Sequence, residues 1–266
     1  MGGFGDADTM SHQGSDPVGS IGWTERTGGV LTLREGLSLM RPLVRDELRI
    51  TAGLLAMALR RHPGRRSVVD PAALVPPDSS VARDAEEAAQ DLLTPVLLNH
   101  SRRAYAWGAA IAALQDVTFD RELLYVAALF HDTGLPSPVP HVDFTIRSAQ
   151  LAREFTDRRG VPPGGRELVA DAIAMHHTPG VGPQAGAEAF LLSAGAGVDV
   201  FGLRSDEIPD AVRRSVVRDF PRLGFKREFA AAWRAEAKQV PRGRAWFLHR
   251  FALSDVTIRL APFPDD

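Results

Sequence analysis

The sequence predicts an all-α protein: a single helical bundle with extra helices and a disordered tail at its N-terminus. Apolar residues recur at helical spacing in segment after segment from Ser79 onward, and residues that begin or end helices separate these segments. Runs of alternating polar and β-branched residues are scarce, so we expect no sheet. The 266 residues are enough for one large domain or two small ones, with an ample core.

Composition and helix-breaking residues divide the chain into four predicted segments: a disordered tail (1–20), an N-terminal helical extension (21–72), a main domain (73–240) and a C-terminal extension (241–266). The tail is rich in Gly, Asp and Ser and lacks the apolar stretch of a signal peptide. In the extension, helical patterns cover about Leu33–Val44 and Arg45–Arg61, and the second stops at His62-Pro63-Gly64. Val75-Pro76-Pro77-Asp78 predicts an irregular connection into the main domain.

The main domain contains helical patterns with recognisable starts. Asp78, Ser79 or Ser80 can cap the first of them. Thr94-Pro95 begins the second, because proline is tolerated at the first helical position, and Asp120 caps the third. The expected helices cover residues 81–89, 94–114, 121–132, 144–158, 165–177, 187–200, 210–220 and 227–239.

Composition also excludes several classes of function. The chain has no cysteine, so disulfides, thiolate nucleophiles and Cys-based zinc sites are ruled out, and any metal must be held by nitrogen and oxygen. The formal net charge of −2 gives no electrostatic footprint for nucleic acid or an anionic membrane. The apolar stretch Ala52–Leu59 is too short to cross a bilayer. We therefore expect a soluble, cytoplasmic protein that acts on a small molecule, without nucleic-acid or membrane partners, and compatible with a homo-oligomer.

Ionisable residues in three separate apolar helices form the main candidate site. His131 and Asp132 close a helix that is apolar nearly all round, and a buried polar pair needs partners. His100 lies in a second such helix, and Asp199 is the single charge in the stretch Leu191–Gly202. A lone histidine on an apolar face is more often a satisfied core residue, but the adjacent aspartate argues against that interpretation at His131.

These groups together predict a buried site for one divalent metal ion. Two neutral imidazoles and two carboxylates offset a 2+ charge and leave coordination positions for water. Such mixed nitrogen and oxygen ligation suits Zn, Fe, Mn, Co or Ni better than Ca, and zinc is the first expectation. The predicted metal ligands are His100, His131, Asp132 and Asp199.

The order His, then His-Asp, then Asp on consecutive helices resembles the HD-domain superfamily of metal-dependent hydrolases. Shorter motifs resemble its cyanamide hydratase branch, over residues 75–78, 97–103, 172–176, 192–202 and 220–226. The similarity covers about Ala73 to Gln239. The family usually carries acidic residues just before the helix that contains Ala149–Phe155, whereas Thr145 and Arg147 stand there in this chain. Because of that departure, the substrate of this protein can differ from the substrate of the family.

The resemblance implies catalytic roles for Asp132 and His176, with His176 acting as an extra ligand or as a proton donor or acceptor. Its neighbour His177 is interpreted equally well as a helix C-terminal histidine favoured by the macrodipole. A second metal would require both His176 and His141. Asn99 can support a ligand through a hydrogen bond, or can simply face solvent. Arg103 can bind an anionic substrate or pair with a buried aspartate.

The favoured hypothesis is hydration or hydrolysis of a small nitrile- or cyanamide-like substrate by metal-activated water. The alternative is an HD-type phosphohydrolase acting on a nucleotide or other phosphoester, for which Arg102 and Arg103 are the available cations. A di-iron oxygenase is a further alternative that needs the second metal. A non-catalytic binding module ranks last, because all four main ligand positions are intact.

Overall fold

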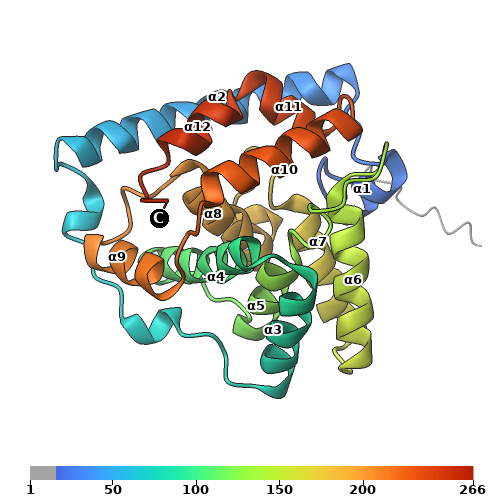
Figure 1. Cartoon of the computed structure of the whole chain (residues 1–266), viewed down its shortest axis with the longest axis horizontal. Coiled ribbons are helices and arrows are strands. Elements are labelled where there is room, and N and C mark those ends of the chain that lie inside the picture. The colour runs from blue at the N-terminus through green and yellow to red at the C-terminus, as the bar shows by residue number, and fades with distance from the viewer. Residues whose placement is uncertain (1–15, 266) are drawn as a thin grey trace, which may run out of the picture.

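The computed structural model describes residues 16–265, and within that range it consists of helices and connecting segments without a β-strand (Figure 1). The all-α prediction is confirmed. The α-helices are α1 (Ile21–Thr27), α2 (Leu33–Ala58), α3 (Ser80–Leu92), α4 (Pro95–Gln115), α5 (Arg121–Phe130), α6 (Phe144–Arg158), α7 (Pro163–Met175), α8 (Ala187–Phe201), α9 (Asp210–Asp219), α10 (Phe225–Gln239), α11 (Arg244–Phe251) and α12 (Ser254–Leu260). Residues 1–15 of the predicted tail lie outside the described residues, and Ser20 caps α1. No helix of the described part is both long and apolar enough for a membrane span.

Helices α4 and α8 form the centre of the bundle, and their backbones approach closely where glycines face the partner helix. A Cβ atom on Gly195 would lie 2.0 Å from the carbonyl oxygen of Ala104, and one on Gly108 would lie 2.7 Å from that of Leu191. Both contacts are closer than carbon and oxygen atoms can tolerate, so only glycine permits this packing. The close approach brings the N-terminal part of α4, with His100, against the C-terminal end of α8, which carries Asp199.

Helices α5 and α7 pack beside this central pair, and their C-terminal ends point into the same region. Almost every residue of α5 after its first turn is buried, which explains its apolar sequence. The helix ends at Phe130, one residue before His131, and α7 ends at Met175, one residue before His176. The predicted helices over 121–132 and 165–177 therefore end slightly earlier, with a histidine as the C-cap residue of each.

The N-terminal extension contains one long helix instead of the two that were predicted. Helix α2 runs through the expected break between Val44 and Arg45, with Pro42 inside it, and Thr32 and Glu35 form a capping box at its start. The inner face of α2, with Leu43 and Ile50, is buried on both sides of the expected break, so packing favours one continuous helix. In Figure 1, α2 runs along the top of the molecule on the same side as α11 and α12, two helices that the sequence did not predict.

A buried arginine, Arg244 of α11, ties the C-terminal helices to the bundle. Its guanidinium donates hydrogen bonds to Asp143 Oδ2 at 2.9 Å, to Thr145 Oγ1 at 3.0 Å and to the carbonyl oxygen of Ala174. Next to it, the Glu236 carboxylate accepts a hydrogen bond from the backbone N–H of Phe144 at 3.0 Å. Burial, followed by the nearby Asp143 carboxylate, raises the pKa of Glu236 to about 8.

We predict that Glu236 makes folding weaken as the pH rises. Because its folded pKa lies above the ordinary value of 4.5, its contribution is fully present below pH 4.5 and is lost as the pH rises through about 8. Between pH 5.5 and 8 the free energy of unfolding should fall by on the order of 3 kcal/mol from this group. Urea unfolding should show that Glu236→Gln removes this part of the pH dependence. The control Glu228→Gln, on the same helix, should keep it, and equal slopes for all three proteins would contradict the prediction.

Candidate metal centre

Asp199 holds His100 in place from behind. The Nδ1 atom of His100 lies 2.8 Å from Asp199 Oδ2. The same carboxylate accepts hydrogen bonds from Arg103 Nε at 2.8 Å and Nη2 at 2.9 Å, from Arg222 Nη1 at 3.0 Å and from Trp107 Nε1 at 3.1 Å. Burial alone would raise the pKa of Asp199, but the two guanidinium groups hold that pKa well below its usual value. The carboxylate is therefore ionised, and His100 Nδ1 must donate to it.

The other two site histidines are fixed by one repeated local arrangement at helix ends. His131 Nδ1 lies 2.7 Å from the carbonyl oxygen of Ala128, and His176 Nδ1 lies 2.7 Å from that of Ile173. Each contact spans three residues, within the last turn of the helix. A carbonyl oxygen only accepts hydrogen bonds, so Nδ1 carries the proton on both rings and Nε2 is left with a free lone pair.

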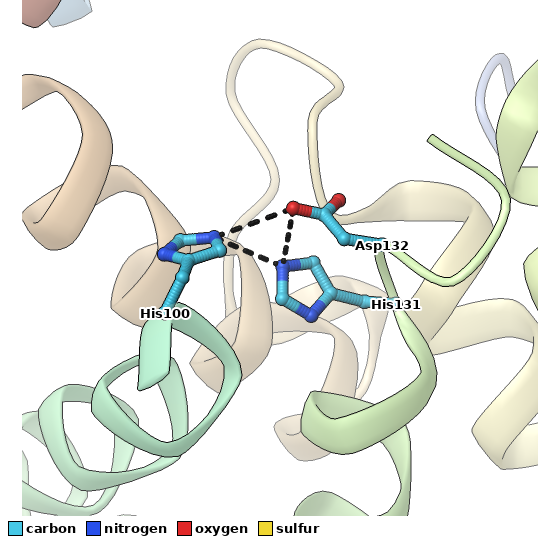
Figure 2. Close-up of side chains that lie close together, drawn as sticks. All are labelled: His100, His131 and Asp132. Carbon is cyan, nitrogen blue, oxygen red and sulfur yellow. Dashed lines mark hydrogen bonds and ion pairs between the residues drawn. The ribbon is translucent and has the colours of Figure 1, made fainter. Parts of the chain in front are cut away.

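The free Nε2 atoms converge on the carboxylate of Asp132 (Figure 2). His100 Nε2 and His131 Nε2 lie 3.2 Å apart, and Asp132 Oδ2 lies 3.5 Å from the first and 3.4 Å from the second. His176 Nε2 lies 3.7 Å from Asp132 Oδ1. Asp132 Oδ2 is buried and has no hydrogen-bond partner within residues 16–265. With Nδ1 protonated on each ring, these facing lone pairs repel one another unless a cation lies between them.

The spacing of the three atoms fits a divalent transition metal. Two ligand atoms that are each about 2.0–2.1 Å from an ion, at a tetrahedral angle, lie about 3.3 Å apart. The three separations of 3.2, 3.4 and 3.5 Å all fall close to that value. Imidazole nitrogen with carboxylate oxygen is a donor set that zinc and its neighbours in the first transition row accept. His100, His131 and Asp132 would hold such an ion.

The structure thus brings three of the four predicted ligands together and places Asp199 behind His100. The role of Asp199 as a direct metal ligand stays a prediction. In this structure both of its carboxylate oxygens already accept hydrogen bonds. A carboxylate that accepts the second ring N–H of a ligating histidine fixes the ring and its tautomer. Arg103 pairs with this buried aspartate, as one of its two predicted roles required.

The remaining candidates lie further from the cluster. The amide of Asn99 donates to the carbonyl oxygen of Pro221 and accepts from Arg102, so it holds the chain ahead of α10. Its side chain is buried and does not face solvent, and these hydrogen bonds do not go to a predicted ligand. His141 is exposed on the loop before α6. The second metal site that would need His141 together with His176 is therefore not assembled in the described part of the chain.

Sequence reasoning assigned no role to Arg222, and it left His177 without a clear one. Arg222 is fully buried and is the second guanidinium on Asp199. Its sequence signal is its place in the motif 220–226, which resembles the cyanamide hydratase branch. His177 stacks on Phe144 and meets Trp233 edge-on, and neither ring nitrogen has a hydrogen-bond partner among the described residues. Burial, followed by the positive charge of Arg244, lowers the pKa of His177 well below its usual value.

A cavity of about 360 Å³ leads from the surface to the cluster. His100, Asp132 and His176 lie at its inner end. Its walls come from α2, α8, α10, α11 and the segment 177–184. A small molecule can thus reach the predicted ligands.

Comparison with known proteins agrees with this site. Residues 97–215 match the HD domain family, and this stretch includes all four predicted ligands. This match confirms the resemblance to the HD-domain superfamily that the sequence motifs indicate. Two cyanamide hydratases of Saccharomyces cerevisiae, DDI2 and DDI3, are each 29% identical to this chain over 194 residues, which cover 71% of this chain and 84% of the relative. The resemblance to the cyanamide hydratase-like branch is confirmed.

We predict that metal content depends on the converging residues. The protein should carry one divalent ion per chain, and His131→Ala or Asp132→Ala should lose it because each removes one of three convergent donors. His141→Ala, on an exposed loop, is the matched histidine control and should keep the ion. Elemental analysis of the purified variants measures this. Full occupancy in Asp132→Ala would contradict the assignment.

A second prediction concerns the buried charges. Arg103→Met removes two of the hydrogen bonds to Asp199 and leaves that ion short of positive charge, which should destabilise the fold by about 3 kcal/mol. The neighbouring Arg102 pairs with Glu86 in a partly exposed position, so Arg102→Met should cost about 1 kcal/mol or less. Urea unfolding of both variants gives the comparison. Equal losses of unfolding free energy in the two variants would show that the buried Arg103–Asp199 pair contributes no more to stability than the partly exposed Arg102–Glu86 pair.

Proposed function

We propose that this protein is a metal-dependent hydratase that adds water across the carbon–nitrogen triple bond of a small nitrile or cyanamide. The observation that carries the proposal is the convergence of the free Nε2 atoms of His100 and His131 on Asp132 at the end of a cavity. The similarity to two yeast cyanamide hydratases supports the choice of reaction. We propose zinc as the metal and the cytoplasm as the compartment.

Held by His100, His131 and Asp132, a divalent ion would lower the pKa of bound water towards about 7 and would polarise an electrophile. His176 is then the residue placed to move protons. Burial, followed by the positive character of His131 and His177, lowers the pKa of His176 well below its usual value. Its Nε2 is therefore free near neutral pH, and it can accept a proton from the attacking water.

The carboxylate of Asp132 lies beside this base, with Oδ1 facing His176 Nε2 and Oδ2 facing the other two histidines. Its negative charge would stabilise the His176 ring once that ring has taken a proton. The oxygen of water bonds to the nitrile carbon, and the proton taken by His176 passes to the nitrile nitrogen. For cyanamide the product is an isourea that tautomerises to urea. His131 Nδ1 and His176 Nδ1 stay bound to backbone carbonyl oxygens, so the rings keep their orientation during the proton transfers.

Phosphoester hydrolysis has less support from the geometry. The two cations proposed for a phosphate are already paired, Arg102 with Glu86 and the fully buried Arg103 with Asp199. Neither lines the cavity. A di-iron oxygenase is similarly disfavoured, because His141 lies on an exposed loop.

The proposal predicts that the metal-loaded protein converts cyanamide to urea. His131→Ala is the background control. His176→Ala should lower kcat by about 10²- to 10⁴-fold, the range typical of a lost general base, while keeping its metal. Urea formation and metal content are measured on the same samples. No urea above the His131→Ala level would overturn the cyanamide reaction, and a metal-free His176→Ala variant would show that this residue is a ligand.

A further inference from the structure

The cavity is much larger than cyanamide needs. Its volume of about 360 Å³ lies in the range of roughly 300–1,000 Å³ in which proteins bury drug-sized ligands. Cyanamide has three non-hydrogen atoms and fills the space of about two water molecules, at ~30 Å³ each. Most of the cavity would then hold nothing but solvent while cyanamide reacted.

An aromatic wall begins at the predicted metal ligand His100 and runs away from it. The ring of Phe229 lies 5.6 Å from that of His100, and Trp233 stacks on Phe229 at 5.7 Å with an angle of 17° between the rings. Trp233 in turn meets His177 edge-on. Both Phe229 and Trp233 line the cavity, so a flat apolar group attached to the reactive end of a substrate would lie along this wall.

Helix α2 also lines the cavity, and it does so partly with aliphatic side chains. Leu43 and Ile50 are buried on its inner face and line the space, together with Leu248 of α11. Residues 33–58 lie outside the stretch that matches the HD domain. This wall is therefore an addition to the domain that carries the predicted ligands.

The charges around the outer part of the cavity compensate one another. Arg49 and Arg204 both face Glu207, and Arg45 lies 3.7 Å from Asp46. Each arginine of the described lining thus lies near an acidic side chain, which agrees with a neutral substrate. Inside, Trp233 Nε1 and both nitrogens of His177 are buried without hydrogen-bond partners in residues 16–265.

We infer that the site acts on neutral cyanamides or nitriles with an aryl or large alkyl substituent, and that the cavity lined by the Phe229–Trp233 wall and helix α2 holds this substituent. This inference rests on the proposed hydration and specifies its substrate class. For phenylcyanamide, the oxygen of water bonds to the nitrile carbon, and both protons end on the former nitrile nitrogen. The product is phenylurea, and no other reactant is needed.

The test compares two substrates and adds a binding measurement that needs no turnover. The metal-loaded full-length protein should hydrate phenylcyanamide with a kcat/KM roughly tenfold or more above that for cyanamide, because the ring adds buried apolar contact. Phenylurea should bind by calorimetry at the same site and inhibit competitively. Urea itself should bind at least roughly tenfold more weakly, for the same reason.

Variants locate the effect in the cavity. Ala196→Leu adds volume on the α8 wall and should lower the phenylcyanamide-to-cyanamide ratio of kcat/KM by roughly tenfold and weaken phenylurea binding. Ser193→Leu, on the same wall, serves if the first variant folds poorly. Leu48→Ala, on the exposed outer face of α2, is the matched control and should leave the ratio unchanged.

Two kinds of failure are distinguishable. Tight phenylurea binding that Ala196→Leu weakens, without hydration of either compound, would support the cavity assignment and overturn the proposed function. Hydration of cyanamide with a higher kcat/KM than phenylcyanamide, without phenylurea binding, would overturn this inference and leave the proposed function standing. If neither hydration nor binding is found, both are wrong.

Discussion

The buried carboxylate of Asp199 is the interaction on which the site depends. An ionised group without solvent is costly unless it is paired and hydrogen-bonded, and Asp199 meets that requirement with two guanidinium groups, an indole N–H and an imidazole N–H. Its partners come from α4 and from the segment just before α10, while Asp199 itself lies in α8. These three parts of the chain must be in register before the charge is compensated, and the same register fixes the orientation of His100.

Two further histidines are oriented without any distant partner. His131 and His176 each use a carbonyl oxygen from the last turn of the preceding helix, where backbone acceptors have no partner within the helix. The local arrangement sets the ring tautomer, and the packing of α5 and α7 sets the position. The site therefore combines one long-range network around Asp199 with two local hydrogen bonds, at His131 and His176. Only the network around Asp199 requires buried charges.

Much of the fold could be predicted because its signals are local. Helix α6 begins and ends at the predicted residues, since Asp143 caps it and its apolar face is regular. The predicted break between Val44 and Arg45 was wrong, because the apolar face of α2 continues through it to Ile50. The short helices α11 and α12 were missed, and their sequences offer no long periodic pattern.

The centre of the site was predictable for a similar reason. An ionisable residue inside an apolar helix is unusual on its own, so His100, the His131-Asp132 pair and Asp199 stood out before any contact was known. The separate roles of these residues, as converging donors or as the partner that orients His100, were not predictable. Which carboxylate faces the histidines and which faces the arginines depends on the packing of α4 against α8. The same holds for Arg222, whose importance appears only when α10 lies against the bundle.

The path of α2 across the cavity has a consequence for how this protein can change over generations. The predicted metal ligands and helix α2, which lines part of the cavity, are encoded in separate stretches of the gene, residues 97–215 and 33–58. Mutations in the second stretch can reshape the chamber while the first continues to be selected for holding its ligands. Close relatives should therefore diverge faster in α2 than around the histidines, and grafting α2 between them is a direct route to altered selectivity.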